Sequence, residues 1–203
     1  MRKSIVLSGI CFLLLAGMMF CGCGKNEKKK YAAADEATLF VKSDFSLVCT
    51  VIDSLDKDYY DTEELKSFID KKINDFNYDV LEEAIKLEGI ETEGETVKVI
   101  MKYASAAHYA AFNQEVLFVG TITDAIDGGY DFNTVFREYK NLKEAALADA
   151  IYDTANHVVI MEPSENMIIK LPDKVKYIGG NVVEKDKSTV QIPANLRSYI
   201  IYE

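Results

Sequence analysis

An uncharged run of sixteen residues, Ile5 to Phe20 (IVLSGICFLLLAGMMF), most strongly limits what this 203-residue chain can become. As a helix the run would extend about 24 Å, less than the ~30 Å hydrocarbon core of a bilayer. Arg2 and Lys3 precede it, and a small residue, Gly22, follows close behind it. A basic start, a short apolar core and a small-residue end are typical of a secretory signal peptide rather than a membrane-spanning helix. We therefore expect the rest of the chain to leave the cytoplasm.

Two cysteines, Cys21 and Cys23, stand where an ordinary signal peptide would have an A-x-A-like pair of small residues. This ending resembles the lipobox of bacterial lipoproteins, in which a small residue precedes the cysteine that receives a diacylglyceryl thioether before cleavage. Gly22 gives Cys23 the small neighbour that a lipobox has, whereas bulky Phe20 precedes Cys21. The resemblance implies lipidation at Cys23, with Cys21 as the alternative. An uncleaved anchor helix and an ordinary signal peptide with accidental cysteines are the two other interpretations.

Cleavage before Cys23 would divide the chain into three parts. These are a lipoprotein signal peptide (1–22), a lipidated, basic tether (23–36) and a single globular domain (37–203). The tether contains KNEKKK, with the lysines Lys25, Lys28, Lys29 and Lys30. Lysines beside an anionic leaflet contribute about 1 kcal/mol each to binding, so we expect this segment to lie close to the lipid. A simple solvated spacer is the plainer interpretation.

The remaining cysteines fit this division. Cleavage would remove Cys11 and Cys21, and lipidation would block Cys23, so that Cys49 is left as the one thiol and no internal disulfide forms. Cys49 lies in the apolar run SLVCTVI, where a free cysteine usually packs as a small hydrophobe. No basic residue or histidine neighbours it in sequence, so a catalytic nucleophile is not indicated.

Charge and composition exclude one class of partner. The chain has a formal net charge of −10, and loss of Arg2 and Lys3 with the signal peptide would make it −12. Nucleic-acid binding requires a basic patch, so we expect no nucleic-acid partner. Hydrophobic residues at 49% and only three prolines favour one compact domain over a disordered stalk.

Sequence patterns after the tether predict an α+β fold: a mostly antiparallel sheet of short strands with two or three packed helices. Helical spacing of apolar residues begins after Asp61, which with Glu64 has a capping-box-like spacing. A second, short helix follows Ser105, and a third is expected over 132–153, after a Gly128-Gly129 turn. Alternating or short apolar runs predict strands over 37–43, 46–52, 84–89, 96–103, 116–123, 158–161, 167–171, 175–178, 182–185, 189–192 and 198–202. The first two of these should form a hairpin.

Residues able to do chemistry are few, and the sequence indicates no cofactor and no metal site. His108 and His157 have no metal-ligand spacing around them, so hydrogen-bonded structural histidines are the better interpretation. The acidic run DSLDKDYYDTEE, tested as a calcium loop from Asp56, lacks the glycine and the final glutamate of an EF-hand. With 33 acidic residues, carboxylate pairs carry no signal by themselves.

These features favour a lipid-anchored cell-envelope protein that works as a binding or interaction module on the outer face of the cytoplasmic membrane. In general character it resembles small uncharacterised lipoproteins of Gram-positive anaerobes. Its expected partners are the lipid bilayer, through the diacylglyceryl cysteine, and an envelope protein or a glycan. The alternatives are an envelope hydrolase with a carboxylate site and a substrate-capture lipoprotein of a transporter.

Overall fold

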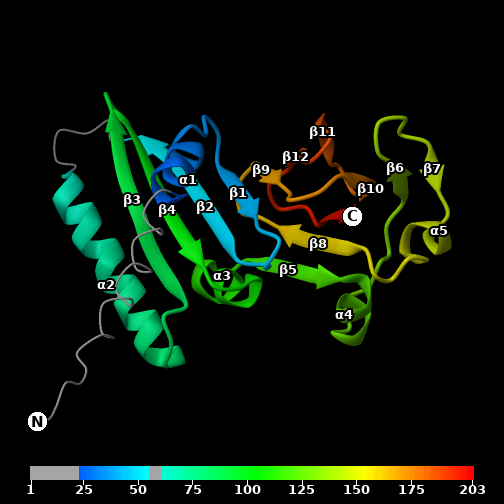
Figure 1. The fold of residues 1–203 in the computed structure, drawn as a ribbon, viewed down its shortest axis with the longest axis horizontal. Coiled ribbons are helices and arrows are strands. Elements are labelled where there is room, and N and C mark those ends of the chain that lie inside the picture. Colours follow the sequence, from blue (N-terminus) through cyan, green and yellow to red (C-terminus); the bar gives the residue numbers. More distant parts are fainter. Residues whose placement is uncertain (1–22, 55–60) are drawn as a thin grey trace, which may run out of the picture.

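The computed structural model describes residues 23–54 and 61–203, which form two sheets with helices around them (Figure 1). The alternative lipidation residue, Cys21, and the tested calcium loop around Asp56 lie outside these ranges. Mixed helices and mostly antiparallel strands confirm the expected α+β class. No helix in 23–54 or 61–203 is long and apolar enough to cross a membrane.

The seven-stranded sheet has the strand order β11-β12-β9-β1-β2-β4-β3. Its strands are β1 (Thr38–Val41), β2 (Leu47–Ser54), β3 (Ile85–Glu93), β4 (Thr96–Tyr103), β9 (Met167–Lys170), β11 (Val183–Asp186) and β12 (Thr189–Ile192). All neighbours are antiparallel except β1 and β9, which run parallel. The expected β1–β2 hairpin is confirmed, with Leu39 opposite Cys49.

The six-stranded sheet is antiparallel throughout, in the order β5-β8-β13-β10-β6-β7. Its strands are β5 (Val116–Thr121), β6 (Phe136–Glu138), β7 (Glu144–Ala145), β8 (His157–Glu162), β10 (Val175–Gly179) and β13 (Ser198–Tyr202). Both sheets therefore combine strands from before and after His157, because the last fifty residues supply strands to each.

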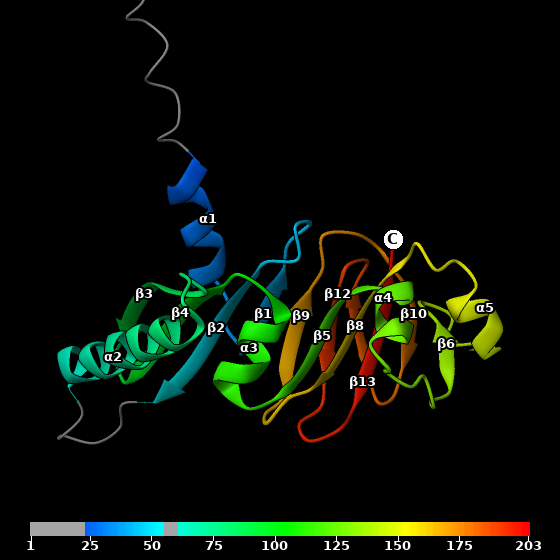
Figure 2. The same ribbon diagram turned by 90° about the horizontal axis from the view of Figure 1, so that it is seen from below.

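Helices cover the sheets on different sides (Figure 2). They are α1 (Cys23–Ala32), α2 (Thr62–Val80), α3 (Ala106–Asn113), α4 (Ile122–Asp127) and α5 (Leu147–Ile151). Helix α1 contacts β2 and β4, while α2 packs on β3 and α3 on β5. Ile122 of α4 and Ala150 of α5 join Ile160 in a second core on the outer face of the six-stranded sheet.

The main core lies between the two sheets and under α2 and α3. Leu39, Cys49 and Met101 face it from the seven-stranded sheet, and Val159 and Ile200 face it from the six-stranded sheet. Since successive strand residues point to opposite faces, their neighbours in sequence point the other way. That opposite face has its own apolar cluster, made of Tyr31, Ala34, Phe40, Val48 and Ile100.

Helix α2 is held by contacts at both ends. The Asp61 carboxylate accepts hydrogen bonds from the backbone N–H groups of Glu63 (2.7 Å) and Glu64 (3.0 Å), as an N-cap should. Near its end, the Asn77 amide donates to the Ile85 carbonyl (2.8 Å) and accepts from the Ile85 N–H (2.9 Å). The helical apolar spacing expected after Asp61 is present, since Ile69, Ile73 and Phe76 pack with the main core, whereas Phe68 is 60% exposed.

The prediction of a helix over 132–153 is wrong. Residues Phe136–Glu138 form β6, which pairs with β10, and the short α5 is all that is helical of this segment. Lys140 and Leu142 have φ of 76° and 55°, which a right-handed helix does not allow. Tertiary burial decided the outcome, because Phe136 is 1% exposed in the core beneath α4 and α5.

Candidate functional site

Helix α1 is the element that places the expected lipidation residue. It begins at Cys23 and projects from the body with its first turn outermost (Figure 2). Three of the expected tether lysines, Lys28, Lys29 and Lys30, are exposed on it, and Lys25 lies in its first turn. The segment expected as a tether is thus largely a helix, of about 15 Å if measured end to end.

The C-terminal end of α1 is fixed to the seven-stranded sheet by Tyr31. This side chain is 5% exposed and meets Phe40 of β1 edge-on, with the ring centroids 4.9 Å apart. The Thr50 hydroxyl of β2 donates to the Tyr31 carbonyl at 3.1 Å. Burying an aromatic side chain contributes roughly 1.5–3 kcal/mol, so Tyr31 anchors an otherwise polar helix.

A lysine from the sheet caps the same helix end. Lys98 of β4 donates from Nζ to the carbonyls of Ala32 (3.0 Å) and Ala34 (2.7 Å). The last carbonyls of a helix have no partner within it and carry partial negative charge, so a cation there is stabilising. Lys98 therefore joins the end of α1 to β4.

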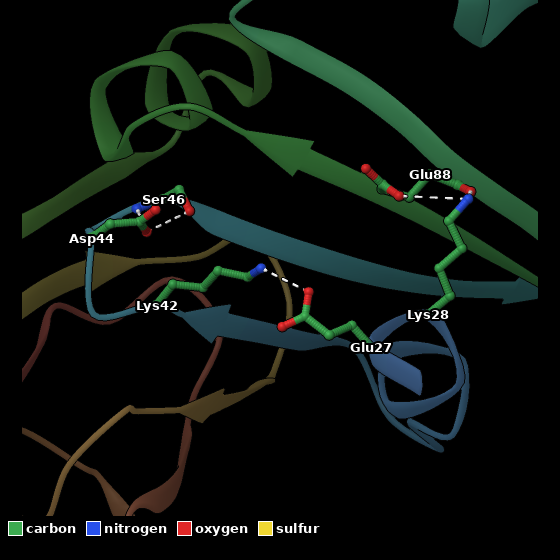
Figure 3. A network of polar contacts seen from close by, with 6 residues as sticks. All are labelled: Glu27, Lys28, Lys42, Asp44, Ser46 and Glu88. Carbon is green, nitrogen blue, oxygen red and sulfur yellow. Dashed lines mark hydrogen bonds and ion pairs between the residues drawn. The ribbon is translucent and has the colours of Figure 1, made fainter. Parts of the chain in front are cut away.

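Two ion pairs hold the middle of α1, as Figure 3 shows. Lys42 Nζ lies 3.3 Å from Glu27 Oε2, and Lys28 Nζ lies 3.7 Å from Glu88 Oε2 and donates to the Glu88 carbonyl at 3.1 Å. Burial opposes a charged Lys42, but its contacts with Tyr31 and Glu27 outweigh this and raise its pKa. Exposed pairs of this kind contribute about 0–1 kcal/mol each, so they orient the helix more than they stabilise it.

The turn after β1 is fixed by Asp44, also drawn in Figure 3. Its carboxylate accepts hydrogen bonds from the Ser46 hydroxyl (2.6 Å) and the Ser46 N–H (3.0 Å). These two bonds lower the pKa of Asp44. The turn therefore has a set shape, which places Lys42 beside α1.

Cys49 is a buried core residue. It is 1% exposed, and burial, followed by the charge of Glu115, raises its pKa to about 12. Such a thiol is neutral and unreactive at ordinary pH. This position supports the interpretation of Cys49 as a small hydrophobe.

We therefore expect iodoacetamide at pH 8 to leave Cys49 unmodified in the native protein and to alkylate it fully after unfolding in guanidinium. Peptide mass spectrometry of the Cys49 fragment, before and after denaturation, measures this. Fast alkylation of the native protein would show that the thiol is accessible.

The two histidines occupy separate structural positions. His108 Nδ1 lies 2.9 Å from the hydroxyl of Ser105, the N-cap of α3, and its Nε2 lies 2.8 Å from Glu82 Oε1. His157 stacks on Tyr202 with ring centroids 5.2 Å apart. Within the described ranges, no three His, Cys, Asp or Glu side chains gather where they could hold a metal ion.

Acidic residues occur together in two places. A cavity of about 430 Å³ is lined by Glu138, Asp149 and Asp153, together with the rings of Tyr152 and Tyr177. Elsewhere, Glu115 accepts hydrogen bonds from Tyr109 (3.0 Å) and from the Ser164 hydroxyl (2.5 Å).

Glu165 lies near Glu115. Partial burial is the main cause that raises the pKa of Glu165, and the negative charges of Glu115 and Asp53 raise it further. The Glu115 carboxylate is therefore engaged by two hydrogen-bond donors, whereas Glu165, although partly desolvated beside it, remains exposed to solvent.

An apolar groove of about 440 Å³ lies between α2 and α3. Its lining includes Phe68, Phe76, Met101 and Phe112. The groove is on the opposite side of the seven-stranded sheet from α1, since α2 packs with the main core and Tyr31 with the other cluster.

No family model, curated protein or solved structure matches the chain. The arrangement with the most specific geometry is the junction of α1 with the seven-stranded sheet, where Cys23 begins a helix whose other end is fixed.

Proposed function

We propose that the chain is a lipid-anchored cell-envelope protein whose domain works as a binding module on the outer face of the cytoplasmic membrane. The observation that carries the proposal is the position of Cys23, the lipobox-like cysteine, at the outer end of α1. A lipid on Cys23 would attach through a short helix that Tyr31 and Lys98 hold on the domain. Such a connection restricts the domain's orientation more than a flexible spacer would.

Binding is favoured over hydrolysis by the state of the carboxylates. Hydrolysis by a carboxylate pair requires one acid and one base facing a common space, with pKa values moved apart. Glu115 and Glu165 come nearest to this, yet Glu115 is engaged by Tyr109 and Ser164. Substrate capture for a transporter is favoured least, because two-lobed receptors need two separate bodies, whereas here both sheets mix strands from each half of the chain.

Cys23→Ser is expected to abolish lipid attachment, because serine has no thiol to form the thioether. The host is fed a labelled fatty acid, and the N-terminal tryptic fragment is weighed from wild-type and variant membranes. The wild-type fragment should begin at Cys23 and carry a diacylglyceryl group, whereas the variant should be unlabelled and give the fragment 4–25, because trypsin cuts the uncleaved chain after Lys3 and Lys25. Cys21→Ser is the matched control and should behave as wild type.

Label lost in Cys21→Ser and kept in Cys23→Ser would move the anchor to Cys21. An unlabelled, uncleaved wild-type chain would refute the lipoprotein proposal. In the same membranes, chemical cross-linking should recover one reproducible envelope partner, and recovery of none across growth conditions would contradict a binding role.

A further inference from the structure

We propose that one end of the seven-stranded sheet docks on anionic phospholipid headgroups of the membrane that holds the anchor. This end, the lysine end, is defined by Lys42, Lys86, Lys102 and Lys170 with the α1 lysines Lys28, Lys29 and Lys30. The inference rests on the proposed function, since a lipid on Cys23 would bring the lysine end within reach of the bilayer.

Strand directions gather four of these lysines at one end. Lys170 ends β9 and Lys42 follows β1, and these two strands are parallel. Antiparallel pairing places the start of β2, the end of β4 and the start of β3 at the same end, which brings Lys102 and Lys86 there.

The register also puts three of these lysines in one row on one face. Lys170 is opposite Phe40, Phe40 is opposite Val48, and Val48 is opposite Lys102. Lys102 is in turn opposite Lys86. Since directly paired residues point to the same face, the row lies on the face that carries α1. Like charges directly opposite each other, as at Lys86 and Lys102, are unfavourable without an anion nearby.

Three ammonium groups converge on the aromatic pair beneath α1. Lys30 Nζ and Lys170 Nζ lie 5.8 Å and 5.3 Å from the ring centre of Phe40. Lys42 Nζ lies 5.6 Å from the ring centre of Tyr31. The rings attract each cation, while the cations repel one another, so the cluster is suited to an external anion.

Carboxylates balance part of this charge. Glu27, Glu83 and Glu88 pair with Lys42, Lys86 and Lys28 respectively. The pKa of Asp186, in the neighbouring β11–β12 turn, is lowered mainly by hydrogen bonds from Ser188 and to a smaller extent by Lys170.

Four of the seven lysines of the lysine end have no carboxylate partner among the described residues. Within residues 23–54 and 61–203, no ion pair forms at Lys29, Lys30, Lys102 or Lys170. The lysine end is therefore cationic in a chain whose formal net charge is −10.

A lipid surface fits this arrangement better than a soluble anion. The lysines are spread over a row of strands and a projecting helix, which matches an extended charged plane rather than a single small ligand. Lys42 donates to Glu27 of α1, so the helix that would carry the anchor lies beside the lysine end. The acidic remainder of the domain would be repelled by the leaflet, which favours this one orientation.

The test uses the protein purified from the membranes of its host and reconstituted into vesicles of phosphatidylcholine alone or with 30% phosphatidylglycerol. Lysine acetylation by a water-soluble reagent is followed by peptide mass spectrometry. We expect acetylation of Lys102 and Lys170 to slow at least about fivefold in the anionic vesicles, the factor that one lysine–leaflet contact provides. Lys66 and Lys71 on α2 should react equally in both, and 1 M salt should remove the protection.

Variants separate charge from folding. Lys102→Gln with Lys170→Gln should return Lys30 to the acetylation rate seen in neutral vesicles. Lys66→Gln with Lys71→Gln, the matched control, should leave Lys30 protected. Circular dichroism melts of both variants identify any loss of folding.

Equal acetylation of Lys102 and Lys170 in the two vesicle types would overturn the docking proposal. Protection found in native membranes but absent from anionic vesicles would also overturn it, and would point to an anionic polymer instead. The same digest reports the mass at Cys23, so a missing diacylglyceryl group refutes the anchor separately. Protected lysines on such a chain would still support docking.

Discussion

Phe40→Ala is expected to lower the free energy of unfolding by about 3–5 kcal/mol and to release α1 from the sheet. Phe40 is 3% exposed and is the contact through which Tyr31 fixes the helix. Removing the ring leaves a cavity between α1 and β1, and it removes the surface that Lys30 and Lys170 approach. Denaturant unfolding measures the stability, and amide hydrogen exchange at 28–34 reports the release of α1.

Phe68→Ala is the matched control, since it removes the same side chain from a position that is 60% exposed. Its free energy of unfolding should change by no more than about 0.5 kcal/mol, and α1 should keep its protection from exchange. Equal losses in the two variants, or unchanged exchange in α1 after Phe40→Ala, would mean that α1 is not held by this contact.

Asn77→Ala is expected to cost about 2–6 kcal/mol of stability. The Asn77 amide satisfies both the N–H and the carbonyl of Ile85, a residue that is 1% exposed. Without the amide, two buried backbone groups lose their partners, and each such loss costs about 1–3 kcal/mol. The effect should appear in thermal and denaturant unfolding, with α2 losing protection from exchange first.

Asn74→Ala is the appropriate comparison because Asn74 is exposed on the same helix and gains the same helix propensity on substitution. It should leave stability unchanged or raise it by a few tenths of a kcal/mol. If Asn74→Ala were as destabilising as Asn77→Ala, the bridge between α2 and β3 would not be the cause.

Elements whose signals are local could be predicted from the sequence. Asp61 and Ser105 cap α2 and α3 as expected, because a capping side chain bonds to backbone two or three residues away. The strands of the last fifty residues also follow their apolar runs, since Pro and Gly turns separate them. The division of strands between two sheets was not predictable, because pairing depends on residues far apart in sequence.

The sequence does not predict the structure of segments whose conformation depends on contacts with residues far away in the chain. Residues 132–153 have apolar residues at helical spacing. Phe136 is instead buried in strand β6, which pairs with β10 in the six-stranded sheet. Helix α1 was expected only as a tether, since nothing in its own polar sequence predicts that Tyr31 will be buried on β1.

Part of the candidate site could be predicted from the sequence. The cysteine and the lysines that follow it are contiguous, so the lipobox-like pattern and the basic segment could be recognised. Lys42, Lys102 and Lys170 join the α1 lysines only through strand register, above all through Phe40 lying opposite Lys170. The one local sign was the alternation of Lys98 and Lys102 with apolar residues in β4.

The parallel pairing of β1 with β9 also constrains when the domain can form. Thr38 is opposite Ile168, so β1 pairs with a strand that lies far along the chain, and the sheet cannot be completed before β9 is present. Closing so long a loop is entropically costly and makes folding slow. A polypeptide that crosses a membrane through a translocation channel must stay unfolded during passage. On the proposed export of this protein, the β1–β9 pairing would delay completion of the seven-stranded sheet until β9 has emerged.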